Sequence, residues 1–359
     1  MSRIAIIDTH INQDLICCNG ITHINVHERG NIRNNSVSHG TLCAMVLDHC
    51  TRDYEIVNIQ IFENKRGKVY GNIDVLKKAL QLCCKQKIDI ISLSVATSIL
   101  SDSLQIYSIT KELSEKSIIV SALDNNDYVS IPASYPHVIG VRNDVHGIMN
   151  PGELAFDAKG LCGGNIYANC DFGFLRTNNC TPSNSFAVPV VTAYINNMIN
   201  RGCSIRDIRN SINELPRYPD CSISELNHFH TLNRADVPIV VIASSDPNCA
   251  IRIINEFYEK YDVQATAVSL KNAEYDIRVK CIDNLIELPG TLENMKEYYK
   301  TDLIIVDVND PLPMYMSKKI FVDVSVVYSR TGCAFIYNDI TETVPCTHVA
   351  EKLYEVLTK

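Results

Sequence analysis

The segment Ser183-Asn184-Ser185-Phe186-Ala187-Val188-Pro189 joins a turn of small residues to an apolar run. This pattern predicts a helix over residues 186–199 with Ser185 at its amino end. Backbone N–H groups without partners and the positive end of the helix dipole stabilise negative charge at such a position. Pro189 fits the first helical turn, where no hydrogen bond is lost. Ser185 is therefore either a helix cap or a serine placed for chemistry.

Length and charge limit the classes of protein to consider. A chain of 359 residues predicts two domains. The net charge is −8 and the basic residues form no cluster, which argues against binding to nucleic acid or to a membrane surface. No apolar run is long enough to span a bilayer. The apolar N-terminal stretch is also too short for a signal peptide, so we expect a cytoplasmic protein.

The cysteines favour free thiols in a reducing compartment. There are 15 of them, an odd number, and no Cys-x-x-Cys pattern occurs. Cys162, Cys170 and Cys180 share one loop-rich segment, but their spacing matches no zinc pattern. We therefore expect no structural metal, although a site in that segment is the alternative.

Strand and helix patterns alternate through the first 215 residues. An apolar strand ends on Asp8, and His39 directly precedes an apolar helix. Further strands are expected at 54–62, 89–96, 117–123 and 137–142, and helices at 73–85, 101–116 and 204–215. Such alternation predicts an α/β fold, a parallel sheet with helices on both faces.

Three short motifs stand in the chain order Asp, His, Ser, which is the order of subtilisin-type triads. They read Asp8-Thr9-His10, His39-Gly40-Thr41 and Ser183-Asn184-Ser185-Phe186-Ala187-Val188-Pro189. Residues 1–215 resemble the subtilisin-like serine protease (subtilase) family, whose members carry D-[ST]-G, H-G-T and G-T-S-x-A-x-P. Four further segments match family patterns in register: Ser94-Val95-Ala96-Thr97, Ala122-Leu123-Asp124-Asn125, Pro132-Ala133-Ser134-Tyr135-Pro136-His137-Val138-Ile139-Gly140-Val141 and Asp157-Ala158-Lys159-Gly160.

The resemblance implies a site and a reaction. Ser185 would attack a peptide carbonyl, His39 would accept its proton, and Asp8 would orient His39. Asn125 would hold the oxyanion. Ser94, Val95 and Ala96 would pair with an extended substrate. The expected partner is a peptide or protein substrate, and no cofactor or metal is expected.

Several residues depart from the family pattern. Ser183 and Asn184 replace glycine and threonine before Ser185, Asp124 replaces glycine before Asn125, and His10 replaces glycine after Asp8-Thr9. Glycine marks close backbone approach, so these changes can narrow the site. A carboxylate at Asp124 would also oppose an oxyanion unless it points away. The alternative function is therefore a subtilase-fold protein that binds a peptide without cutting it.

The remaining residues predict a linker at 216–235 and a smaller α/β domain at 236–359. His228 and His230 lie in the linker, where a solvated segment is favoured over a metal site. The domain carries no phosphate-binding or dinucleotide motif. Substrate recognition or self-association is its expected role. No pro-segment precedes Ile4, which fits a processing protease with a restricted substrate, for example in peptide maturation.

Overall fold

The computed structural model describes most of the chain, and the residue ranges it describes are 1–26, 37–65, 68–157, 160, 163–219, 237–271, 274–313, 316, 319–329, 332–338 and 340–358. Residues 220–235 of the linker predicted at 216–235, with His228 and His230, lie outside the described residues, as does Cys162. Two compact units are present. Unit 1 comprises Met1–Ser98 and Asp102–Asp220, and unit 2 comprises Ile99–Ser101 and Cys221–Lys359.

Unit 1 contains an eight-stranded sheet among its described residues. The strand order is β2-β3-β1-β6-β7-β8-β10-β9, and every neighbouring pair is parallel except β10 and β9. The bounds are β1 Ser2–Asp8, β2 Ile21–Asn25, β3 Tyr54–Gln60, β6 Ile90–Leu93, β7 Ile118–Ala122, β8 Ile139–Asn143, β9 Leu154–Phe156 and β10 Gly164–Ala168. The predicted parallel α/β sheet is confirmed.

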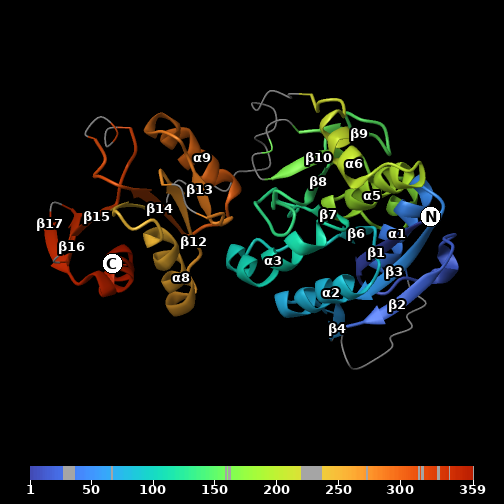
Figure 1. The fold of residues 1–359 in the computed structure, drawn as a ribbon, viewed down its shortest axis with the longest axis horizontal. Coiled ribbons are helices and arrows are strands. Elements are labelled where there is room, and N and C mark those ends of the chain that lie inside the picture. Colours follow the sequence, from blue (N-terminus) through green and yellow to red (C-terminus); the bar gives the residue numbers. More distant parts are fainter. Residues whose placement is uncertain are drawn as a thin grey trace. The chain divides into compact units, whose positions relative to one another are not determined.

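Helices cover both faces of this sheet (Figure 1). Their bounds are α1 His39–Cys50, α2 Ile73–Lys85, α3 Ser103–Leu113, α4 Gly173–Thr177, α5 Asn184–Asn200 and α6 Ile205–Asn213. Alternate side chains of β1, such as Ile4 and Ile6, share one core cluster with α1, α5 and α6. Because successive side chains of a strand point to opposite faces, the other side chains of β1 face the side on which α2 and α3 lie. Both strand faces are therefore apolar, as a doubly covered parallel sheet requires.

The parallel arrangement places several polar residues at one edge of the sheet. Asp8 is the last residue of β1, Ser94 directly follows β6, and Asn125 lies three residues after β7. The carboxyl ends of parallel strands meet at the same edge, where α/β proteins bind their ligands. The amino ends of α1 and α5 bring His39 and Ser185 to the same edge.

Helix α5 begins two residues earlier than predicted. It spans Asn184–Asn200, and Ser183 occupies the N-cap position without a side-chain capping bond. Ser185 is therefore inside the first turn, and the interpretation of Ser185 as the cap is wrong. Pro189 is inside the helix, so its placement in the first turn is also wrong. Proline has no N–H, and the carbonyl four residues before it needs another donor.

Other local predictions differ in smaller ways. A two-stranded hairpin of β4 Glu63–Lys65 and β5 Lys68–Tyr70 lies between the strand and the helix expected at 54–62 and 73–85. Short 3₁₀ helices occupy Gln13–Leu15 and Leu100–Asp102. Ser204 and Asp207 form a capping box at the start of α6, with both reciprocal hydrogen bonds present.

Unit 2 is a second α/β body, as the sequence predicts. Its described sheet has the order β13-β12-β14-β11-β15-β16-β17, parallel as far as β15 and antiparallel beyond it. A buried ion pair joins Lys271 Nζ and Asp307 Oδ1 at 2.5 Å at the ends of its central strands. The elements are β11 Ile239–Ala243, α8 Cys249–Tyr261, β12 Ala265–Ser269, β13 Val279–Cys281, 3₁₀ helix Leu285–Glu287, α9 Leu288–Tyr298, β14 Leu303–Val308, β15 Val324–Ser329, β16 Gly332–Tyr337, β17 Ile340–Val344, 3₁₀ helix Cys346–His348 and α11 Val349–Leu357.

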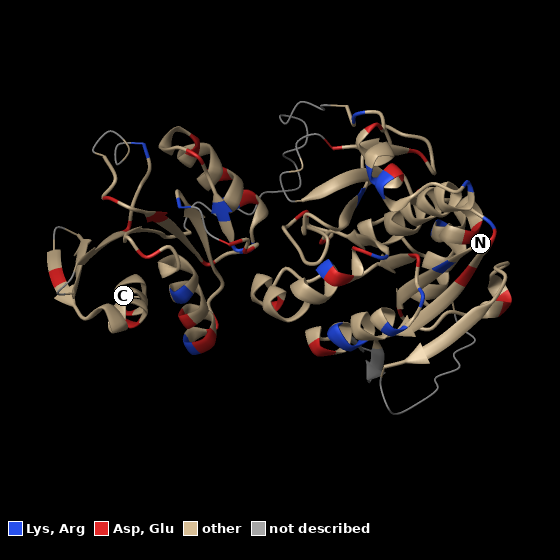
Figure 2. Cartoon of the chain, viewed as in Figure 1, with Lys and Arg blue, Asp and Glu red and all other residues tan. Residues whose placement is uncertain are grey.

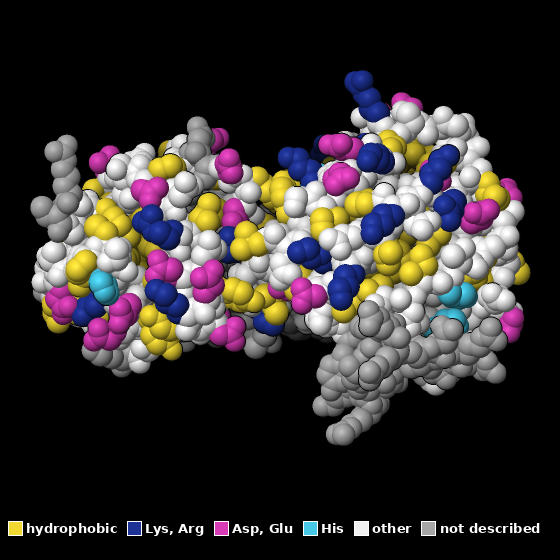
Figure 3. All heavy atoms as spheres, turned by 60° about the horizontal axis from the view of Figure 1, so that its bottom comes forward, with side chains coloured by type: hydrophobic (Ala, Val, Ile, Leu, Met, Phe, Trp, Pro, Cys, Tyr) yellow, Lys and Arg dark blue, Asp and Glu magenta, His cyan; other side chains and the backbone are white. Residues whose placement is uncertain are grey.

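The charged side chains are dispersed and the described cysteines are unpaired, as the composition predicts. Lys and Arg side chains are interspersed with Asp and Glu along the described elements (Figure 2), and the face in Figure 3 shows the two signs spaced among apolar side chains. The cysteines that the structure describes carry free thiols. Of the helices in the described ranges, none has the length and apolar character to cross a membrane.

Candidate active site

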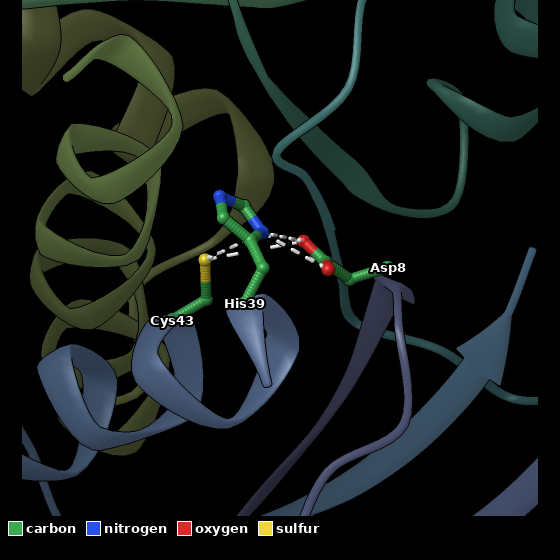
Figure 4. Close-up of side chains that lie close together, drawn as sticks. All are labelled: Asp8, His39 and Cys43. Atoms are coloured by element: carbon green, nitrogen blue, oxygen red, sulfur yellow. Dashed lines mark hydrogen bonds and ion pairs between the residues drawn. The ribbon is translucent and has the colours of Figure 1, made fainter. Parts of the chain in front are cut away.

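Asp8 provides a buried carboxylate at the end of β1. Its side chain is fully buried, and Oδ1 accepts a hydrogen bond from Thr9 N at 2.6 Å. The carboxylate also faces His39 Nδ1, at 2.8 Å from Oδ2 and 3.0 Å from Oδ1 (Figure 4). A hydrogen-bonded carboxylate in this position selects the tautomer with hydrogen on Nδ1 and leaves Nε2 able to accept a proton.

The start of α1 is fitted closely against the end of β1. Ser38 caps the helix by accepting from Thr41 N at 3.1 Å. Gly40 N donates to Thr9 Oγ1 at 2.8 Å, and a Cβ atom on Gly40 would lie only 2.7 Å from Thr9 O. Glycine is thus required after His39, because any side chain would push the helix away from the strand that carries Asp8.

Cys43, in the apolar helix that begins at His39, is a third group beside this pair. Its sulfur lies 3.8 Å from His39 Nδ1, 3.9 Å from Asp8 Oδ2 and 3.8 Å from Ser185 O. In Figure 4 the thiol and the imidazole project from successive turns of α1 toward the carboxylate. Residues four apart share one helix face, so the spacing of His39 and Cys43 was a signal in the sequence.

Ser185 is held by a reciprocal pair of hydrogen bonds with Ser94. Ser94 Oγ donates to Ser185 O at 2.8 Å, and Ser185 Oγ donates to Ser94 O at 3.2 Å. Ser94 thus supplies the donor that Pro189, four residues after Ser185, lacks. Within the described residues, the Ser185 hydroxyl bonds to this carbonyl and not to His39. The backbone of Ser185 is nevertheless near His39, since Cys43 Sγ lies 3.8 Å from both Ser185 O and His39 Nδ1. The ring of Phe186 also packs 4.9 Å from the His39 ring between centroids.

Asn125 contacts the start of α5. Its Oδ1 accepts from Asn184 N at 3.1 Å, so its NH₂ group is the part of the amide that can donate to another oxygen. The neighbouring Asp124 carboxylate accepts from Asn126 N at 2.8 Å and Asn126 Nδ2 at 3.0 Å. These bonds turn the Asp124 carboxylate toward Asn126, which reduces the repulsion that the sequence led us to expect.

The predicted substrate strand continues β6. Ser94 contacts Ser185 as described, while Val95 and Ala96 are partly exposed. Thr97 closes the segment through an antiparallel bridge to Ile131, with hydrogen bonds of 3.0 and 2.9 Å. Ser94 therefore lies beside Ser185. The pairing of Ser94, Val95 and Ala96 with substrate stays a prediction.

Electrostatics around His39 favour its charged form. Negative charge on the Cys43 sulfur, present only when the thiol is ionised, and on the Asp8 carboxylate raises the pKa of His39 above the ordinary imidazole value, whereas burial lowers it. Burial also raises the pKa of the Cys43 thiol. The thiol is therefore neutral at physiological pH, and the charge that acts on His39 there is that of Asp8.

The raised pKa gives a prediction for the pH dependence of Ser185 reactivity. A general base must be neutral, so reactivity rises with pH as His39 loses its proton. We expect the midpoint of this rise above about 6.5, the value for a free imidazole. The rate of modification by a fluorophosphonate, measured from pH 5 to 10, gives the midpoint. Cys43→Ala should leave it unchanged, whereas a fall in that variant would mean that the sulfur is charged.

Asp8, His39 and Cys43 could together hold a metal ion. One ligand atom from each lies within 4.8 Å of the others. An ion bound there would replace the hydrogen bond between Asp8 and His39, so it would inhibit and not assist a triad. Sulfur and imidazole together favour soft cations. A mercuric salt is expected to block fluorophosphonate labelling of the wild type and to spare Cys43→Ala. Equal inhibition of both proteins would place the effect at another thiol.

Known proteins resemble this chain in structure only. No protein-family model and no curated protein matches it. The patellamide maturation protease PatA shares 18% identity over 61% of this chain and 89% of its own, with a TM-score of 0.39. The prenylagaramide maturation protease PagA shares 16% identity over 59% of this chain and 81% of its own, with a TM-score of 0.38. A cold-adapted subtilisin-like serine proteinase shares 11% identity over 57% of this chain and 78% of its own, with a TM-score of 0.42.

At identities and TM-scores this low, the likeness does not assign a function, which has to rest on the side chains themselves. Of the three solved structures, two are described as maturation proteases and one as a subtilisin-like serine proteinase.

Proposed function

We propose that this chain is a subtilisin-type serine peptidase that hydrolyses an extended peptide. The observation that carries the proposal is the 2.8 Å hydrogen bond from His39 Nδ1 to the buried Asp8, beside the helix start that holds Ser185. A buried carboxylate, an imidazole and a serine at the edge of a parallel sheet are the components of a nucleophilic triad.

Substrate binding releases the Ser185 hydroxyl in this mechanism. An extended peptide that pairs with Ser94, Val95 and Ala96 donates a backbone N–H to the Ser94 carbonyl. That carbonyl is the acceptor of the Ser185 hydroxyl in the free protein, at 3.2 Å. The hydroxyl then turns toward His39 Nε2. Catalytic hydrogen bonds of this kind are commonly long or absent until substrate is bound.

Acyl transfer follows in two steps. Ser185 Oγ bonds to the carbonyl carbon while His39 Nε2 takes the hydroxyl proton, and the same proton then goes to the leaving amine as the C–N bond breaks. In the second step, water bonds to the acyl carbon while His39 Nε2 takes its proton. The proton then goes to Ser185 Oγ as the ester bond breaks and the acid is released. Asp8 stabilises the imidazolium in both steps, and the Asn125 amide and Ser185 N–H hold the oxyanion.

We further propose a restricted processing role in the cytoplasm, such as the maturation of a peptide. The free thiols of the described cysteines support a reducing compartment. Unit 2 would recognise the substrate or pair with a second copy of the chain.

A fluorophosphonate probe tests the proposed activity directly. Wild-type protein should gain one phosphonyl adduct on the peptide that contains Ser185, and Ser185→Ala should gain none. Ser183→Ala is the matched control, because Ser183 lies two residues away and makes no side-chain capping bond. It should be labelled like the wild type. No adduct on the wild type would favour the alternative, a protein that binds a peptide without cutting it.

Loss of the Asn125 amide, which would hold the oxyanion, should lower kcat. Asn125→Ala is expected to lower kcat by about 10²–10³ and to change KM little, because the lost hydrogen bond forms mainly in the transition state. Asn19→Ala, which removes an exposed amide beside the first residue of β3, at the other end of the strands, should stay near the wild-type rate. Peptide hydrolysis followed by mass spectrometry gives both constants. A change in KM alone would assign Asn125 to substrate binding.

A further inference from the structure

Asn184 is a buried side chain that the triad does not use. It is the first residue of α5 and directly precedes Ser185, and 5% of its surface is exposed. The family pattern has threonine at this position, so nothing in the resemblance assigns the asparagine a role.

Every hydrogen-bonding group of the Asn184 side chain is used. Its Oδ1 accepts from Asn143 N at 2.8 Å, at the end of β8. Its Nδ2 donates to Asp124 O at 2.9 Å and to Leu123 O at 3.4 Å, in the loop that follows β7. One side chain therefore ties two strand ends of the sheet to the start of α5.

The backbone of Asn184 completes the connection. Its N–H donates to Asn125 Oδ1 at 3.1 Å. The segment from Leu123 to Asn125 is thus bonded to Asn184 three times, from both side chain and backbone. Because an amide has one acceptor and two donor hydrogens, asparagine can bond β8 and the loop together, whereas the single hydroxyl donor of threonine cannot make the same set.

We propose that Asn184 is a positioning residue, which fixes the Asn125 amide relative to Ser185. The proposal rests on the proposed peptidase function, and it deepens that function by naming what holds the oxyanion site. Asn184 does not touch the substrate. Its side chain acts through Asn125, because the bonds from Nδ2 to Leu123 O and Asp124 O hold the backbone that leads into Asn125. The backbone N–H of Asn184 bonds Asn125 Oδ1, which leaves the NH₂ group of Asn125 to face the oxyanion.

The chain provides a matched control on the same helix. Asn196 is also buried in α5, and its Nδ2 donates to Thr51 Oγ1 at 2.8 Å and to Arg52 O at 2.9 Å. It lies three helical turns beyond Asn184. Asn196→Ala should therefore destabilise the fold to a similar degree without reaching the site.

A double-mutant cycle distinguishes positioning from a purely structural role. Asn184→Ala is expected to lower kcat by about 10²-fold with little change in KM, the effect of a misplaced catalytic group. In the Asn184→Ala background, Asn125→Ala should then cost less than about 10-fold, against 10²–10³ in the wild type. Asn196→Ala should leave kcat and the full cost of Asn125→Ala in place. Effects of Asn184 and Asn125 that simply multiply would overturn the proposal.

A second measurement does not depend on activity. Hydrogen–deuterium exchange of residues 121–128 should be faster in Asn184→Ala than in Asn196→Ala, and Asn184→Asp should also exchange faster, since it keeps the acceptor and loses the donors. Unchanged exchange would overturn the proposal even in an active enzyme. If the wild type does not react with the fluorophosphonate, the proposed peptidase function is wrong. Residues 123–125 would then have no catalytic role, whatever their exchange rates. If Asn184→Ala does not fold, Asn184→Thr tests the same cycle with the family residue.

Discussion

Replacement of His39 by alanine is expected to lower the rate of Ser185 acylation by a factor on the order of 10⁶, the largest effect predicted for this chain. Without an imidazole the Ser185 hydroxyl keeps its proton and remains a poor nucleophile. The fold should persist, because α1 keeps its Ser38 cap and the Gly40 contact with Thr9.

Two measurements define this effect. The acylation rate comes from hydrolysis of a peptide substrate at saturating concentration, with the fluorophosphonate rate as an independent check. His49→Ala is the control, since His49 lies in the last turn of the same helix and is exposed. It should react like the wild type. A His39→Ala protein that reacts at the wild-type rate would show that another group removes the proton.

Replacement of Asp8 by asparagine is expected to lower kcat by about 10⁴. The two side chains have the same shape, and Oδ1 can still accept from Thr9 N. The asparagine amide, however, donates to His39 Nδ1, so the ring carries its hydrogen on Nε2 and cannot accept one from Ser185. Loss of the negative charge should also move the midpoint of the pH profile to lower pH.

Steady-state kinetics of Asp8→Asn across pH check both parts of this prediction. Asp14→Asn, a change at an exposed carboxylate in the nearby 3₁₀ helix Gln13–Leu15, should alter neither kcat nor the midpoint. A midpoint that stays in place in Asp8→Asn would mean that Asp8 does not set the pKa of His39.

Local sequence patterns predicted the elements of unit 1 well, because each element is a regular and apolar segment. The strand that ends on Asp8 and the helix that follows His39 were both recognised from runs of apolar residues. Parallel pairing then follows from the alternation of strands and helices, and it brings the strand ends to one edge.

Errors arose where a contact distant in sequence decided the local structure. The start of α5 was placed at Phe186, but Asn184 already belongs to the helix because its side chain is bonded to β8 and to the loop after β7. Pro189 is tolerated inside the helix because Ser94 donates to the carbonyl that the proline leaves without a partner. Neither donor nor acceptor is near in the sequence, so no local pattern reports it.

The sequence by itself determined the order of strands and helices, the residue types of the candidate triad and the glycine beside His39, since these depend on periodicity and short motifs. Only the tertiary structure decided that Cys43 lies beside Asp8, that Ser185 bonds to Ser94 in the free protein, and that Asn184 joins the end of β8 to the loop after β7. The physical reason is range. Propensity and periodicity act over a few residues, whereas these contacts join atoms separated by 35 to 91 positions in the chain.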